Sequence, residues 1–231
     1  MDGQTLSRRA RYRAETREEA KEIALRQMAE GGMDAVSLNA IGKEMGVTGP
    51  ALYRYFASRD ALLTDLIVDA YGDLAMALET AVERVGQATP GARLRAIAAA
   101  IRAWALAQPH RYLLLYGTPV PGYTAPAGTV PLAQRVFTPI LTALAESAAP
   151  AGALDARLST LDRQFDAWMQ DGEARMPGHV FRRGVIWWTR LHGLISLEVA
   201  GHFAGMGFDP TLLYEAEVDT LLVETGGAPV S

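Results

Sequence analysis

The residues best suited to chemistry lie in one short segment, 48–55, which reads TGPALYRY. Arg54 carries a planar guanidinium that can bind a guanine edge or a phosphate oxygen. Tyr53 and Tyr55 offer hydroxyls that can donate to phosphates. Core packing is the preferred alternative for Tyr53, and for Tyr55 the two interpretations stay open. The segment therefore predicts contact with nucleic acid, with Arg54 as its main reader.

The residues before this arginine are small or carry a hydroxyl group. Gly49, Pro50 and Ala51 would let a helix approach base edges closely, and a methyl group there can touch thymine. Thr48 and Ser37 each stand at the expected start of a helix, where free backbone amides can bind phosphate. The predicted DNA-binding set therefore also includes these five positions.

Two short helices joined by a tight turn are predicted to hold this segment in place. Ser37 can cap the first helix, and Gly46 falls where a helix ends in a left-handed residue. Thr48 then caps a second helix that runs to Phe56. The inner faces share the residues expected to close the hairpin, which are Leu38, Ile41, Met45, Val47, Leu52 and Phe56. This is a helix-turn-helix pattern, although any helical hairpin in a bundle shows the same periodicity.

The run MGVTGPALYRYFASRDALL resembles the recognition helix and following helix of TetR/AcrR-type transcriptional regulators. The matching residues are Gly46, Val47, Thr48, Ala51, Leu52, Tyr53, Tyr55, Phe56, Ser58, Arg59, Ala61 and Leu62. The resemblance implies that Arg59 binds a phosphate and that the helix from Ser58 couples the DNA-binding domain to the C-terminal domain. It also implies a homodimer formed through the last two helices, binding a pseudo-palindromic operator on double-stranded DNA.

Composition favours an all-α fold for the whole chain. The sequence has 231 residues, of which 49% are hydrophobic and 21% charged, with alanine-rich stretches and few β-branched runs. About nine to ten helices are expected, at residues 13–31 (or from earlier in the basic arm), 37–45, 48–56, 58–81, 90–108, 110–117, 131–148, 154–170, 177–204 and 209–224. The predicted domains are a helix-turn-helix domain with a basic arm at 1–59, a ligand-binding and dimerisation domain at 60–225, and a tail at 226–231.

Charge is divided unevenly along the chain, although the net charge is only −4. Residues 1–59 have a balance of +2, and residues 60–231 have a balance of −6. Four arginines, Arg8, Arg9, Arg11 and Arg13, crowd the N-terminal arm. This asymmetry indicates a module that meets phosphates joined to one that does not, although the arm is also compatible with a merely solvated segment.

The second half resembles the so-called WHG ligand-binding domain of some TetR-like regulators through Trp188, His192 and Gly193. Trp188 and His192 are four residues apart and share one helical face. His192 is either a ligand contact or a buried packing residue, and packing is preferred. Aromatic side chains on the middle helices can line an apolar effector cavity, or simply fill a core: Trp104, Tyr112, Tyr116, Phe137, Phe165 and Trp168. The Pro- and Gly-rich stretch 117–131 is expected to be a long loop.

Several other classes of protein lack support. The sequence has no phosphate-binding glycine motif, no nucleophile elbow and no zinc-protease motif, so no enzyme activity, cofactor or metal is expected. There is no 18-residue apolar span and no signal peptide, which argues against a membrane partner. The absence of cysteine fits the cytoplasm.

Together the residues and the resemblance predict a homodimeric, DNA-binding transcriptional regulator of the cytoplasm. A small hydrophobic or aromatic effector would release it as a repressor from its operator. Two alternatives stay open: a constitutive DNA binder without an effector, and a helical module whose N-terminal hairpin binds protein.

Overall fold

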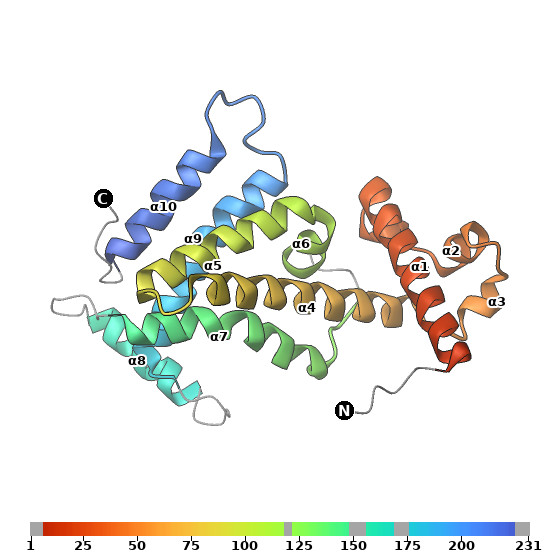
Figure 1. Cartoon of the computed structure of the whole chain (residues 1–231), viewed down its shortest axis with the longest axis horizontal. Coiled ribbons are helices and arrows are strands. Elements are labelled where there is room, and N and C mark those ends of the chain that lie inside the picture. Colours follow the sequence, from red (N-terminus) through yellow and green to blue (C-terminus); the bar gives the residue numbers. More distant parts are fainter. Residues whose placement is uncertain (1–6, 118–121, 148–155, 169–175, 225–231) are drawn as a thin grey trace. The chain divides into compact units, whose positions relative to one another are not determined.

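The computed structural model describes residues 7–117, 122–147, 156–168 and 176–224. Within these residues the regular elements are ten α-helices and two short 3-10 helices, and no strand occurs (Figure 1). The predicted all-α fold is confirmed. The chain divides into two compact units, one made of residues 1–71 and 108–129 and the other of residues 72–107 and 130–231.

The first unit contains the predicted hairpin. Its elements are α1 (Arg8–Gly31), η1 (Met33–Ala35), α2 (Leu38–Glu44), α3 (Gly49–Leu52), the first part of α4 (Arg59–Val85), α6 (Pro109–Tyr116) and η2 (Ala127–Thr129). The core is a cluster of buried side chains from α1, α2, α3, α4 and the turns between them: Ala20, Ile23, Ala24, Met28, Val36, Leu38, Ile41, Leu52, Phe56, Leu62, Leu63 and Leu66. Leu114 and Tyr123 pack against this cluster as well, so residues far along the chain complete the unit.

Local capping chemistry starts and stops these helices, and at Ser37, Gly46 and Ser58 it does so as the sequence predicts. The Ser37 hydroxyl accepts a hydrogen bond from the amide of Ala40 at 3.4 Å, and the Ser58 hydroxyl accepts one from Ala61 at 3.1 Å. Ser7 does the same for Ala10 at the start of α1. Gly46 has φ of 69°, the left-handed conformation that its place in the turn requires.

The first unit refines or corrects the expectation in three places. First, α1 begins at Arg8, the earlier start that the sequence left open, so the basic arm is helical from that residue onward. Second, α3 ends at Leu52, and the amides of Arg54 and Tyr55 bind the carbonyls three residues back, in a tighter turn than an α-helix. Third, Val47 closes the turn through its amide, which binds the Gly42 carbonyl at 2.9 Å, but its side chain is 36% exposed and lies outside the core.

The second unit is a helical bundle built on α9 (Gly178–Val199). Its other elements are the second part of α4, α5 (Pro90–Ala107), α7 (Val130–Glu146), α8 (Ala156–Trp168) and α10 (Pro210–Glu224). Helix α9 contacts α5, α7, α8 and α10, and α5 contacts α7 and α10. The side chains that are almost wholly buried include Leu74, Leu78, Leu94, Ile97, Ile140, Leu144, Trp187, Leu191 and Ile195.

Arginines that are buried or nearly so tie the helices of this unit together. Arg183 donates to the Leu144 carbonyl at 2.9 Å and to the Ser147 hydroxyl at 2.6 Å, which satisfies free acceptors at the end of α7. Arg102 forms a two-pronged ion pair with Glu198, which joins α5 to α9. Both guanidiniums are therefore hydrogen-bonded, as buried charges must be.

Two expectations concern segments that the structure describes only in part or not at all. Residues 117 and 122–126 are irregular, as predicted for the loop, and η2 covers Ala127–Thr129 before α7 begins at Val130. Residues 118–121 and the tail 226–231 lie outside the described residues. The predicted domain boundary at residue 59 stays a prediction. The division into compact units falls between residues 71 and 72, within α4. None of the described helices has the length and apolarity needed to cross a membrane.

Candidate nucleic-acid interface

The predicted reading surface is an exposed tip formed by the turn before α3 and the residues after it. Thr48, Pro50 and Arg54 are exposed, and Tyr53 is 49% exposed. Ala51 is half-buried, and Gly49 lies at the start of α3. The preferred interpretation of Tyr53 as a core residue was therefore wrong. Tyr55 is the tyrosine that packs against the core, as a partly buried neighbour.

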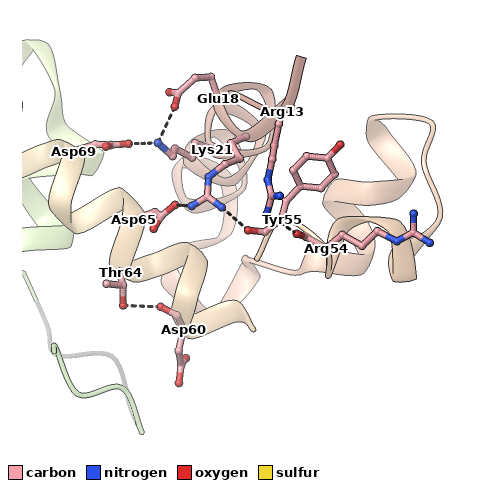
Figure 2. A network of polar contacts seen from close by, with 10 residues as sticks. Arg13, Glu18, Lys21, Arg54, Tyr55, Asp60, Thr64, Asp65 and Asp69 are labelled. Carbon is pink, nitrogen blue, oxygen red and sulfur yellow. Dashed lines mark hydrogen bonds and ion pairs between the residues drawn. The ribbon is translucent and has the colours of Figure 1, made fainter. Parts of the chain in front are cut away.

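Arg54 has its side chain directed into solvent. In Figure 2 its guanidinium points away from the polar network around Tyr55. Among the described residues the structure records no hydrogen bond or ion pair for this guanidinium. A free, exposed guanidinium can reach a base edge or a phosphate without first breaking a bond within the protein.

Two other predicted DNA-binding residues have bonding partners inside the protein. Arg59 donates from Nε to the Val36 carbonyl at 3.1 Å and from Nη2 to the Met33 carbonyl at 2.5 Å. It thereby supports the backbone that leads into α2. Ser37 caps α2 with its hydroxyl, and its own amide donates to Oε1 of Gln27 at 3.0 Å. The expected contacts of both residues with DNA stay predictions.

The basic arm divides into two groups once it is helical. Arg8, Arg9 and Arg11 lie on the first turns of α1 and are exposed. Arg13 instead donates to the Arg54 carbonyl at 3.3 Å, and its guanidinium lies 5.9 Å from the centre of the Tyr55 ring. Arg13 therefore supports the backbone of the segment 48–55, here called the reading segment.

A ladder of ion pairs joins α1 to α4 next to this support (Figure 2). Arg17 pairs with Asp65, and Lys21 pairs with Asp69 at 2.6 Å and with Glu18 at 2.8 Å. Burial alone would lower the pKa of the Lys21 ammonium, but hydrogen bonds and charges from Asp69 and Glu18 outweigh burial and raise that pKa. These pairs were not predicted, because the partners are 48 residues apart and no local pattern links them. The equal four-residue spacing of the two cations and of the two carboxylates becomes meaningful only once α1 and α4 lie side by side.

Comparison with known proteins agrees with this geometry. Residues 22–66 match the family model described as bacterial regulatory proteins, tetR family, and residues 94–221 match the tetracyclin repressor-like C-terminal domain. The HTH-type transcriptional regulator Rv1816 of Mycobacterium tuberculosis is 37% identical over 211 residues, which cover 87% of this chain and 88% of that protein. The chain belongs to the TetR family of bacterial transcriptional regulators.

Solved structures show the same fold for this TetR-family regulator. The putative regulatory protein SCO4313 is 44% identical, with a TM-score of 0.79, and the match covers 94% of this chain and all of that one. The regulator PfmR from Thermus thermophilus is 18% identical, with a TM-score of 0.57, over 90% of this chain and 97% of that one. Members of this family are regulators that bind DNA and are not enzymes. The resemblance to the WHG subset is not confirmed.

The seven residues predicted to line an effector site of this TetR-family regulator fall into separate groups. Tyr112 and Tyr116 lie on α6 in the first unit, with ring centres 5.4 Å apart. In the second unit, Phe165 and Trp168 both contact Phe181, and Trp168 is 68% exposed. Trp104 is a buried residue of α5. Burial raises the pKa of the Tyr116 hydroxyl, which therefore stays protonated and can donate a hydrogen bond.

His192 belongs to a third group, a row of aromatic rings between α7 and α9. Its ring stacks on that of Trp188, with the ring centres 5.4 Å apart and an angle of 18° between the planes. The ring centres of Trp188 and Phe137 are 5.1 Å apart. Burial lowers the pKa of the His192 imidazole, which favours the neutral ring. These contacts are those of a packing residue, and its role toward a ligand stays a prediction.

Two surface grooves of the second unit lie elsewhere. One, of about 540 Å³, lies between α4 and α7 and includes the ion pair of Glu79 with Arg135. The other, of about 290 Å³, lies between α5 and α10. None of the seven predicted residues lines either groove. The predicted apolar site and the described grooves are therefore different places.

Proposed function

We propose that this regulator is a homodimeric repressor that occupies a pseudo-palindromic operator in the bacterial cytoplasm and leaves it when a small molecule fills the second unit. The observation that carries the proposal is the free guanidinium of Arg54 on an exposed helix-turn-helix tip. In this proposal Arg54 reads a base edge or clamps a phosphate. The hydroxyl of the exposed Tyr53 binds a phosphate, and Thr48, Gly49, Pro50 and Ala51 allow close approach of the backbone.

An uncharged face on the last two helices supports dimerisation. On α9 its exposed residues at helical spacing are Ile186, Thr189, Gly193 and Leu197, and Ala200 follows as the C-cap. On α10 they are Leu212, Leu213, Ala216, Thr220 and Val223. An exposed, uncharged and mostly apolar row of this kind is costly to leave in water and fits burial against a second copy. Apart from its chain neighbours and the backbone of its own helix, a Cβ added at Gly193 would meet no atom of the chain within 4 Å.

The dimer is tested by light scattering of wild type and of a Gly193→Arg variant. We expect the dimer mass for the wild type and the monomer mass for the variant, because the new charge would be buried without a partner at the interface. Gly72→Arg is the matched control, since Gly72 is also a helical glycine with open space around it. A monomeric wild type would remove the dimer from the proposal.

Operator recognition is tested by selecting bound sequences from a random pool of DNA duplexes. A dimer with two recognition segments related by a two-fold axis places them in successive major grooves, about 34 Å apart. We therefore expect inverted half-sites whose centres are separated by about ten base pairs. Enrichment of single half-sites would contradict the symmetric operator, and no enrichment would favour the protein-binding alternative.

The aromatic side chains of the second unit support an apolar or aromatic effector. All four tryptophans of the chain lie in this unit, so a bound molecule is expected to change their fluorescence. The probes are a panel of hydrophobic and aromatic compounds together with stearoyl-CoA, which is bound by FadR of Bacillus subtilis, a regulator of similar fold at 15% identity. A true effector raises the unfolding temperature by mass action and releases operator DNA. A compound that stabilises the protein without releasing DNA would favour the constitutive binder.

A further inference from the structure

A row of cations at four-residue spacing follows a single face of α1, and three of them after Arg9 have partners within the protein. Arg13, Arg17 and Lys21 are spaced by four residues, so their side chains project in similar directions. Lys21 donates to two carboxylates, those of Glu18 and Asp69. The two arginines bind backbone carbonyls of the reading segment: Arg13 donates to that of Arg54, and Arg17 donates to that of Tyr55. The two arginines therefore hold the reading segment, whereas the lysine holds α4.

Arg17 has the larger set of contacts. One terminal nitrogen of its guanidinium donates to the Tyr55 carbonyl, and the other donates to the Asp65 carboxylate on α4. The same guanidinium lies over the Phe56 ring, 4.5 Å from its centre. A planar fork with five donors can serve a carbonyl and a carboxylate at once, which the single ammonium of lysine does less well.

The reading segment depends on such outside support because it has little helix of its own. Helix α3 covers only four residues, and the turns after it are held by the bonds from Arg54 to Ala51 and from Tyr55 to Leu52. The carbonyls of Arg54 and Tyr55 therefore lie at a helix end, where carbonyls lack partners within the helix and carry partial negative charge. A guanidinium suits this helix end because it donates hydrogen bonds to the unpaired carbonyls and its positive charge offsets their partial negative charge.

We propose that Arg17 is a positioning residue for DNA recognition, which fixes the peptide between Tyr55 and Phe56 against α4 and thereby sets the direction of the Arg54 side chain. This inference rests on the DNA-binding role of Arg54. The ion pair of Arg17 with Asp65 is about 30% exposed on both sides, and pairs of this exposure contribute little to stability. Loss of Arg17 is therefore expected to weaken recognition more than it weakens the fold.

The experiment compares Arg17→Met with Lys21→Met. Both variants remove one positive charge from the same face of α1 and leave one α4 carboxylate without its cation, but only the first removes a bond to the reading segment. The side chain of Lys21 is the more buried, at 11% exposure against 30% for Arg17, so the control is at least as demanding on the fold. Fluorescence anisotropy gives the affinities for a selected operator and for a scrambled duplex at one salt concentration.

We expect Arg17→Met to lower the ratio of operator affinity to scrambled-duplex affinity about tenfold, which is the effect of about 1.4 kcal/mol. Lys21→Met should leave this ratio within about twofold. Arg17→Lys, which keeps the charge and the fold but not the fork, should give an intermediate loss. If Arg17→Met does not fold, the comparison of operator and scrambled-duplex affinities is made with Arg17→Lys instead.

Hydrogen exchange of the amides of Arg54, Tyr55 and Phe56 gives a readout that does not need DNA. These amides bind Ala51 and Leu52, and they should exchange faster in Arg17→Met but not in Lys21→Met. Equal operator ratios and equal exchange in the two methionine variants would overturn the role of Arg17 alone. A wild type that enriched no duplex would overturn the DNA role of Arg54 and this inference with it.

Discussion

In the first unit, the side chains proposed to meet DNA come mostly from eight consecutive residues, 48–55, and most of them are exposed on one tip. In the second unit, the aromatic side chains proposed to meet an effector come from four helices, α5, α7, α8 and α9, and form separate ring contacts. The first kind of site is built by local turns and caps. The second kind depends on how distant helices pack, so sequence identifies the first far better than the second.

The largest effect is expected from loss of the dimer, which leaves only one reading segment per molecule. Gly193→Arg should lower affinity for a full palindromic operator by about 10²–10⁴-fold, because the second half-site then binds as a separate molecule. Affinity for a duplex with one half-site should not change, since the tip itself is untouched. Gel-shift titration of both duplexes measures the difference, with Gly72→Arg as the control. An unchanged full-site affinity would show that the two tips act without a dimer.

A core truncation in the first unit tests whether the two units unfold independently. Phe56→Ala removes a side chain that is 1% exposed and should cost about 3–5 kcal/mol of the free energy of unfolding. Because the first unit contains no tryptophan, helix loss followed by circular dichroism in urea should begin early while tryptophan fluorescence keeps its midpoint.

Leu144→Ala is the matched truncation in the second unit, where Leu144 is fully buried. It should lower the midpoint of tryptophan fluorescence by an amount that corresponds to about 2–5 kcal/mol. If both variants moved both signals together, the two units would unfold as one cooperative body.

Removal of the proposed reader should cost less than either of these changes. Arg54→Ala should weaken operator binding by about 1–3 kcal/mol and reduce the dependence of log affinity on log salt by about one unit if the contact is to phosphate. If the contact is to a base, the loss should instead be confined to one operator position. Arg163→Ala removes an exposed arginine of the second unit and should change neither quantity.

The structure shows why local signals predicted the hairpin well and its tip less well. Ser37, Gly46 and Ser58 act within three or four residues of themselves, so their types alone place the helix ends. One helix was expected to run from Thr48 to Phe56, with Tyr53 packed in the core and the place of Tyr55 left open. After Leu52 two backbone amides instead bind carbonyls three residues back, as in a 3-10 helix. This tighter turn leaves Tyr53 exposed and brings Tyr55 beside the core.

Long-range partners limited the remaining assignments. Arg17 and Asp65 are 48 residues apart, as are Lys21 and Asp69, and no local pattern links them. Arg59 has the expected charge, but the Met33 and Val36 carbonyls that it binds belong to a turn that the sequence did not predict. The grouping of Trp188 and His192 was predictable because their spacing is local, whereas the contact of Trp188 with Phe137 was not.

The smallest expected effect tests the packing interpretation of His192 through pH. Because burial lowers its pKa below the ordinary value of 6.5, the unfolded chain binds this proton at a higher pH than the folded chain does. Stability of the second unit should therefore fall as pH decreases from about 7.5 to about 5.5, a range that lies above the usual titration of carboxylates. His192→Phe keeps a ring against Trp188 and removes the titration, so its urea midpoint, followed by tryptophan fluorescence, should fall less over the same range. An equal fall in both proteins would mean that the folded and unfolded chains bind the proton of His192 equally well.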